Sequence, residues 1–423
     1  MSYETYRVTD LIDEIAMGPF GSNIKVSCFV DSGVPVLNGS NLEGFSLSEK
    51  AFRFVTKEKA DSLNKANAHR GDIVITHRGT LGQIVFIPQD SRYDRYVISQ
   101  SQFRVRCNDK VLPEYLVYYF HTPIGQHKLL SNASQVGVPA LARPSSTFQQ
   151  IEVELPELSI QKRVVEIITT IQKKIENNQE LNDNLEQQLM LLYDYWFIQF
   201  DFPDNNGNPY QISGGKMVWN DTLRRNIPEN WKVQSVISNC LSSVIKPGVK
   251  IFNTKTYLAT ADVKGTSIST GTIVDYDGRE SRANMQPSIN SVWFAKMKNS
   301  IKHLYLNKEM QPIISSSILS TGFCGLQCNE ISFEYIASYV SNAYFEIHKD
   351  MLAHGATQEA VNNDDLAGVH IIIPEDTVLC AYHETTQAIY AQISKNVCEN
   401  QELVKLRDWL LPMLMNGQAT IND

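Results

Sequence analysis

Long hydrophobic runs are missing from this chain of 423 residues. No apolar stretch approaches the roughly 20 residues of a membrane-spanning helix, and residues 1–17 are too charged for a secretory signal peptide. The seven cysteines are scattered; Cys324 and Cys328 are the one close pair, and no His or Cys cluster accompanies them as a zinc site requires. We therefore expect a cytoplasmic protein with free, buried thiols and no bound metal.

The chain also lacks the loops that mark enzymes acting on nucleotides. It contains neither Gly-x-Gly-x-x-Gly nor a phosphate-binding Gly-Lys-Ser/Thr loop. Asn208-Pro209-Tyr210 approaches the Asn/Asp-Pro-Pro-Tyr/Phe loop of adenine methyltransferases, but it lacks one proline and lies among turn-forming residues, which favours a turn. Asp262-Val263-Lys264 matches only the end of a nuclease motif. We expect no catalytic residue and no cofactor bound by this chain.

Net positive charge is absent as well, since the formal charge is −8. Much of the acidity lies in residues 175–205, which contain no Lys or Arg and seven acids: Glu176, Glu180, Asp183, Glu186, Asp194, Asp201 and Asp204. The rest of the chain is near neutral, so a nucleic-acid partner is not excluded. The acids themselves are typical of a solvated helix face.

A heptad pattern runs through residues 159–200. Its seam recurs at alternating steps of four and three, which is typical of a helix that winds along a partner helix. The seam consists of Val164, Ile168, Ile171, Ile175, Asn178, Asn182, Leu185, Leu189 and Leu192. About 40 helical residues reach roughly 60 Å, more than one globular domain needs.

A second such helix is predicted near the C-terminus, where Asn400-Gln401-Glu402-Leu403 repeats Asn178-Gln179-Glu180-Leu181. Its seam consists of Ile389, Ile393, Asn396, Asn400, Leu403, Leu410 and Leu414. Buried asparagines fix the register of coiled coils, and antiparallel pairing should bring Asn178 and Asn400 together. Pro412 should bend or end this helix, and Gly417 follows as a stop signal.

The whole chain reads as a duplication with a period of about 220 residues. The matching segments, in order, are 36–44 with 257–265, 71–75 with 290–294, 97–99 with 318–320, and 114–116 with 334–336. Each copy reads as mixed α/β, with short β-branched runs (71–88 and 96–106 in the first copy), a helix near 113–130, a glycine-rich loop, a strand and then the long helix. We expect an α+β protein of two tandem α/β units and two long antiparallel helices, related by a pseudo-twofold axis.

Basic residues with interleaved aromatics suggest DNA contacts. Residues 70–106 of the first copy contain six arginines, including Arg104 and Arg106, and the second copy has an acid-free run of lysines with His303. Taken singly, each such residue is more often a solubilising charge than a contact. The candidates are Ser22, Lys25, Arg70, Arg78, Arg92, Arg95, Arg143, Lys250, Lys264, Lys296, Lys298, Lys302, Thr357 and Gln358.

Several motifs together carry a resemblance to a known family. They are Gly18-Pro19-Phe20-Gly21-Ser22, Gly71-Asp72-Ile73, Leu155-Pro156 with Gln161-Lys162-Arg163, the aromatic run of residues 192–203, residues 214–219 (GGKMVW), residues 227–231 (IPENW) and residues 410–418 (LLPMLMNGQ). Over nearly its full length the chain resembles the specificity (S) subunit of type I restriction–modification systems.

The resemblance implies a target-recognition domain at residues 1–156, a long helix at 157–200, a linker at 201–228, a second recognition domain at 229–374, and a distal helix with tail at 375–423. It implies partners: double-stranded DNA, two methyltransferase (M) subunits docked on helices that set the spacer of a split site, and restriction (R) subunits for cleavage. S-adenosylmethionine is expected on M. The second copy lacks Gly-Pro-Phe-Gly-Ser, so the two domains should bind different sequences. The alternative is a protein-interaction scaffold that binds no DNA.

Overall fold

The computed structural model describes residues 3–134, 137–204, 206–356 and 358–419. The chain divides into two compact units, called unit 1 (Met1–Gln172 with Leu406–Asp423) and unit 2 (Lys173–Lys405). Both long helices therefore contribute residues to both units.

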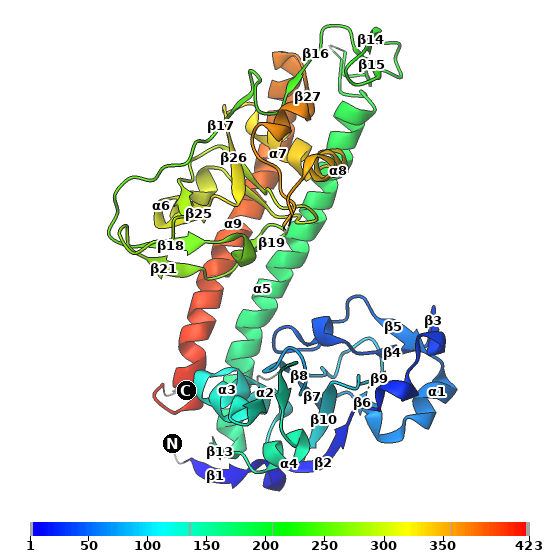
Figure 1. The fold of residues 1–423 in the computed structure, drawn as a ribbon, viewed down its shortest axis with the longest axis vertical. Coiled ribbons are helices and arrows are strands. Elements are labelled where there is room, and N and C mark those ends of the chain that lie inside the picture. Colours follow the sequence, from blue (N-terminus) through cyan, green and yellow to red (C-terminus); the bar gives the residue numbers. More distant parts are fainter. Residues whose placement is uncertain (1–2, 135–136, 205, 357, 420–423) are drawn as a thin grey trace. The chain divides into compact units, whose positions relative to one another are not determined.

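Unit 1 is built on two sheets (Figure 1). The first has the order β2 (Ile12–Met17), β10 (Gln102–Cys107), β7 (Ile73–Thr76), β8 (Ile84–Phe86), and all its neighbours are antiparallel. The second has the order β3 (Phe29–Val30), β5 (Arg53–Val55), β4 (Val34–Val36), β9 (Arg95–Val97), β6 (Asn67–His69), with β4 and β9 parallel. Two short pairs, β1 (Glu4–Arg7) with β13 (Glu152–Leu155) and β11 (Ala133–Ser134) with β12 (Ala140–Leu141), and the helices α1 (Lys57–Ser62), α2 (Pro113–His121), α3 (Pro123–Leu130) and α4 (Pro144–Gln149) complete it.

Unit 2 repeats this topology, except that among the described residues β3 and the β11–β12 pair have no counterpart strands. Its antiparallel sheet has the order β17 (Ser242–Val244), β26 (Phe323–Cys328), β23 (Ser291–Ala295), β24 (His303–Leu306). Its second sheet has the order β21 (Thr272–Val274), β18 (Lys255–Leu258), β25 (Ser317–Ser320), β22 (Ala283–Met285), with β18 and β25 parallel. The pair β16 (Lys232–Ser235) with β27 (His370–Ile373) matches β1 with β13, and α7 (Phe333–Ser341) and α8 (Ala343–Leu352) match α2 and α3. The predicted duplication and the mixed α+β class are confirmed.

Three elements of unit 2 stand outside this repeat in the described chain. They are α6 (Gln311–Ser316), the pair β19 (Val263–Lys264) with β20 (Ser267–Ile268), and the hairpin β14 (Met217–Asn220) with β15 (Arg225–Pro228). The hairpin lies inside the segment predicted as a linker, and Asn208-Pro209 before it lies in a turn closed by Asp204, as expected.

The long helices are α5 (Leu158–Tyr193), continued by a π-helical turn over Asp194–Ile198, and α9 (Asp376–Met415). In unit 2 they run antiparallel, because Asn178 contacts Asn400 whereas Asn182, one turn further along α5, contacts Asn396, one turn back along α9 (Figure 1). The Asn178 Nδ2 to Asn400 Oδ1 distance is 2.9 Å and the Asn396 Nδ2 to Asn182 Oδ1 distance is 2.7 Å. The predicted meeting of Asn178 and Asn400 is therefore confirmed, and none of the sixteen predicted seam residues is exposed.

Two predictions about helices need correction. Pro412, expected to bend or end the last helix, does not end α9, which continues to Met415; Gly417 then turns the chain at a φ of 72°, as the predicted stop signal. A proline so close to the end of a helix leaves few later turns to disrupt. The helix predicted over 113–130 is two helices, because Pro123 cannot continue α2 and Thr122 caps α3 by accepting a hydrogen bond from Gly125 N at 3.1 Å.

The aromatic run of residues 192–203 serves as core rather than as surface. Tyr193, Trp196, Phe197 and Phe200 are each at most 5% exposed, and the Phe197 ring lies 4.6 Å from that of Tyr335. These side chains tie the end of α5 to the unit 2 core. In unit 1 the end of α9 has the same role, through the buried side chains of Leu411, Leu414 and Met415.

Candidate nucleic-acid interface

Three loops of unit 1 are joined by main-chain hydrogen bonds into one surface, called the loop platform (residues 77–83, 99–102 and 137–143). His77 N donates to Ser101 O at 2.8 Å, Gly79 N to Pro139 O at 2.8 Å, and Leu141 N to His77 O at 2.9 Å. These bonds hold the β7–β8 loop between the two others, and the Arg78 side chain on this loop is exposed.

Unit 2 builds the same platform from residues 296–302, 320–322 and 358–361. Lys296 N donates to Gly322 O at 2.9 Å, Lys298 N to Glu359 O at 3.0 Å, and Val361 N to Lys296 O at 3.0 Å. Lys296 thus occupies the place of His77, and Met297 that of Arg78. The two copies share a scaffold of main-chain bonds and differ in the side chains displayed on it.

The structure places only some unit 1 candidates on this platform. Arg78 and Arg143 lie on it and are exposed. Arg70, Arg92 and Arg95 lie elsewhere, Arg95 at the start of β9 and the other two on loops. Arg70 pairs with Asp94 at 3.2 Å, Arg95 pairs with Asp61 at 2.6 Å, and Arg92 lies over the ring of Tyr93. Lys25 is exposed on the segment after β2, where Ser22 also lies, although the Ser22 side chain is outside the described part of the structure.

In unit 2 the candidates near the platform are partly engaged. The Lys298 Nζ to Glu359 Oε2 distance is 2.7 Å, and Lys302 Nζ donates to Thr260 O. Lys296 is half-buried, whereas Lys250, Lys264 and Gln358 are exposed. Thr357 lies outside the described residues.

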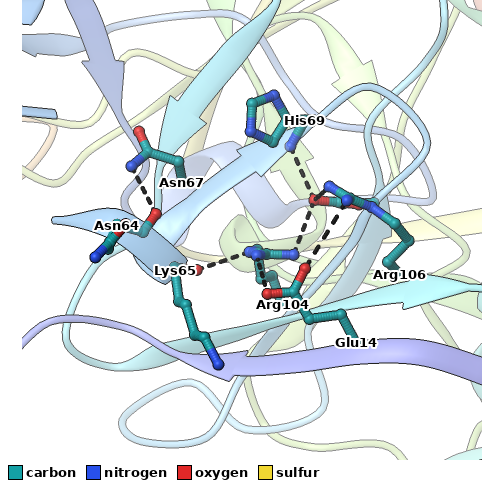
Figure 2. Close-up of polar contacts among 8 residues, drawn as sticks. Glu14, Asn64, Lys65, Asn67, His69, Arg104 and Arg106 are labelled. Carbon is teal, nitrogen blue, oxygen red and sulfur yellow. Dashed lines mark hydrogen bonds and ion pairs between the residues drawn. The ribbon is translucent and has the colours of Figure 1, made fainter. Parts of the chain in front are cut away.

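Arg104 is internal, and Arg106, with 43% of its side chain exposed, is held in the same ion-pair network, which corrects their assignment to the DNA-facing basic set. Arg104 is 4% exposed and Asp72 fully buried. Figure 2 shows Arg104 bonded to Glu14 (2.8 Å) and to the Lys65 carbonyl (2.8 Å), with Arg106 beside it. Asp72 accepts hydrogen bonds from Arg106 Nε (2.9 Å), Arg104 (3.4 Å) and His69 N (2.9 Å). Each guanidinium is used to neutralise and satisfy a buried carboxylate.

Unit 2 fills the same position without charge. Arg104 lies opposite Val74 in the β10–β7 pairing, and the equivalent pair in unit 2 is Gly325 with Trp293. A Cβ at Gly325 would lie 2.5 Å from the Trp293 ring, so the indole takes the room that a side chain would need. Its Nε1 donates to Ser291 Oγ at 2.8 Å, which satisfies the one polar atom of the buried ring.

His303 is likewise internal rather than part of the basic surface. Its Nε2 lies 2.8 Å from Glu346 Oε1, and Lys349 Nζ lies 2.6 Å from Glu346 Oε2. Lys349 is fully buried and also donates to Ala295 O at 3.3 Å. Burial acts to raise the pKa of Glu346, but the hydrogen bonds from His303 and Lys349 outweigh it and the pKa is lowered.

A cavity that the sequence did not predict lies beside the Gly18–Ser22 loop. It encloses about 380 Å³ and is lined by Phe20, Asn38, Arg53 and Gln100 among others. The loop is pressed against the β9–β10 turn, because Gly18 N donates to Gln102 O at 2.8 Å and a Cβ at Gly18 would lie 1.9 Å from Ser99 O. The two glycines of the motif were the available signal, since glycine permits such close approach.

The cysteine thiols only partly match the expectation that they are free and buried. All seven cysteines are free; Cys324 and Cys328 are buried, and burial raises the pKa of the Cys324 thiol to about 12. Cys240 is exposed instead, because it lies in the turn between β16 and β17.

The Asp262 residue of the partial nuclease motif has a structural role. Its carboxylate accepts hydrogen bonds from Ala259 N (2.8 Å) and Ser269 (3.1 Å). Among the described residues there is no cluster of three or more potential metal ligands, and no helix there is long and apolar enough to cross a bilayer.

Comparisons with known proteins agree with this architecture. Residues 3–187 match the family described as the type I restriction modification DNA specificity domain. The chain is 22% identical over 428 residues to the type I restriction enzyme MjaIX specificity subunit of Methanocaldococcus jannaschii, covering 97% of this chain and 92% of that protein. It is 23% identical over 410 residues to the type I restriction enzyme HindI specificity subunit of Haemophilus influenzae, covering 82% and 86%.

The fold is also that of a solved structure, the S subunit of a type I restriction–modification system from M. genitalium, with a TM-score of 0.51 and 12% identity. The alignment covers 98% of this chain and 96% of that one. These matches show that the chain carries a type I restriction modification DNA specificity domain at residues 3–187 and that, over nearly its full length, it is similar to type I specificity subunits.

Proposed function

We propose that this chain is the DNA-recognition subunit of a type I restriction–modification complex, in which unit 1 and unit 2 each read one half of a bipartite, asymmetric site. The observation that carries the proposal is the repeated loop platform, which has the same three main-chain bonds in both copies but different side chains. A scaffold of this kind can present two different sets of hydrogen-bonding groups to two different base sequences.

The partners follow from the same proposal. α5 and α9 dock two M subunits and set the spacer between the half-sites, and R subunits join for cleavage. S-adenosylmethionine is bound by M, and this chain contributes no catalytic group. On its own the chain should bind DNA weakly, because its surface is near neutral or acidic and offers few phosphate contacts.

The test is a unit exchange in the assembled complex with M. Residues 1–156 are replaced by the same region of a relative, and the methylated sites are read from a random DNA library. One half of the methylated sequence should change and the other should persist. Simultaneous change of both halves would show a single composite reading surface. The absence of any salt-dependent DNA binding by the complex would instead support a protein-interaction scaffold.

A further inference from the structure

In each unit one segment crosses from the first sheet to the second, directly after β2 or β17. These crossing segments are residues 18–30 of unit 1 and residues 245–254 of unit 2. They share almost no sequence, yet neither contains an acidic residue, and each carries lysine: Lys25 in the first, Lys246 and Lys250 in the second. Their charge is therefore complementary to DNA phosphates rather than to a basic partner.

Each crossing segment is anchored by apolar side chains that point inward. Ile24 and Phe29 pack against the cluster of Val36, Val55 and Val97 on the second sheet of unit 1. Val249 and Phe252 pack against the matching cluster of unit 2, formed by Tyr257, Ala283 and Ile318. A cation lies over each inward aromatic ring: Arg53 is 5.2 Å from the centroid of Phe29, and Lys255 is 5.8 Å from that of Phe252.

The same segments also point large apolar side chains into solvent. Phe20 is 82% exposed and Ile251 is 83% exposed. A single exposed apolar residue needs no explanation. Here, however, both crossing segments expose large apolar side chains beside lysines although their sequences have diverged: Phe20 and Val26 (82% exposed) in unit 1, and Ile251 in unit 2. Phe20 is also held on a rigid loop, because Gly18 and Gly21 sit against Ser99 and Gln100.

We propose that Phe20 and Ile251 are apolar specificity contacts, each packing against the bases of one DNA half-site. The inference rests on the proposed function and specifies which side chains read part of each DNA half-site. Apolar side chains discriminate bases by contact with the thymine methyl group, or by wedging into a base step that opens easily. The flanking lysines then contact the phosphates on either side.

The experiment uses the full chain assembled with M. Phe20→Ala and Ile251→Ala remove the apolar contacts, and Phe20→Leu retains one. The matched controls are Ile124→Ala in α3 and Ile347→Ala in α8, whose side chains are 55% and 57% exposed but lie outside the crossing segments. Affinity is measured for the cognate site and for two DNAs in which one half-site or the other is scrambled, each at two salt concentrations.

Phe20→Ala should weaken binding to cognate DNA about tenfold, the cost of roughly one mismatched base pair. On the DNA in which the half-site read by unit 1 is scrambled, Phe20→Ala should cause no further loss of affinity. Ile251→Ala should show the same pattern for the half-site read by unit 2. The salt dependence should stay unchanged, because an apolar contact releases no counterions. Phe20→Leu should remain within about threefold of the unmodified complex, a smaller loss than that of a mismatch.

Three results would overturn the inference: Ala variants that behave like their controls, equal losses on all three DNAs, or failure of the variants to assemble with M, which would make these residues protein contacts. If the unmodified complex does not distinguish the cognate site from the scrambled DNAs, the proposed function itself falls. If the unmodified complex does distinguish the cognate site but the Ala variants have no effect, only the inference about Phe20 and Ile251 is overturned.

Discussion

Single residues show how two copies of one fold can diverge without losing it. Arg104 in unit 1 and Gly325 in unit 2 occupy the same place in equivalent sheets, and one is neutralised by Asp72 whereas the other is covered by Trp293. Sequence alone could not separate the buried Arg104 from the exposed Arg78, since both lie in short β-rich segments. The difference depends on Asp72, 32 residues away, and on Glu14, 90 residues away.

We expect Asp72→Asn to lower the free energy of unfolding by about 3 kcal/mol, because it leaves the buried Arg104 without its full counter-charge. Thermal or urea unfolding of the purified chain measures the change. Asp94→Asn is the control: Asp94 pairs with Arg70 at the surface, with 90% of its side chain exposed, and its loss should have no measurable effect. Equal effects of both substitutions would contradict the buried network.

Glu346→Gln should make unit 2 less stable in a pH-dependent way. The folded pKa of Glu346 lies below its ordinary value of 4.5, so its contribution is fully present above that pH and is lost as the pH falls through the folded pKa. The variant should lose about 3 kcal/mol at pH 7, since Lys349 stays buried without its carboxylate. The difference from the unmodified protein should shrink below about pH 4.5.

Unfolding curves recorded from pH 7 to pH 3 test this expectation, with Glu402→Gln as the control. Glu402 pairs with Lys405 on the exposed face of α9. A pH-independent difference for Glu346→Gln would mean that the carboxylate is already protonated in the folded state.

At the scale of elements, the two long helices were predictable and the pairing of the strands was not. The heptad seam depends on local spacing, so the register of α5 against α9 followed from residues such as Asn178 and Asn400. The second sheet of each unit pairs short strands from distant segments, for example β4 with β9, and three-residue strands leave no clear periodic pattern. The loop platform was missed for the same reason, because its bonds join main-chain atoms of any residue type.

The buried asparagine pair Asn182–Asn396 offers a test of the coiled coil. Asn182→Leu alone should lower the free energy of unfolding by about 1–3 kcal/mol, because the buried Asn396 amide loses its partner. Adding Asn396→Leu should restore or raise stability while loosening the register, which light scattering would detect as intermolecular pairing. Stability losses that simply add in the double variant would argue against a direct contact.

At the scale of the whole molecule, α5 and α9 each contribute residues to both units. Lengthening both helices therefore lengthens the helical segment between the residues that belong to unit 1 and those that belong to unit 2. One heptad adds about 10 Å at 1.5 Å per residue. The contacts show how to insert it without breaking the seam: residues 175–181 are duplicated after Leu181, and residues 397–403 after Leu403. Each copy of Asn178 then faces a copy of Asn400.

If the helices set the spacer, the complex of this lengthened chain with M should methylate sites with a longer gap. B-DNA rises roughly 3.4 Å per base pair, so about three base pairs should be added between unchanged half-sites. Three base pairs also rotate the second half-site by roughly 100°, which the segment between the units must absorb, and binding should weaken accordingly. Methylated sites selected from a random library measure both effects. A chain lengthened in α5 alone is the control; its seam is sheared, and it should select no site well. An unchanged spacer in the doubly lengthened chain would mean that the distance between half-sites is set elsewhere than in these helices.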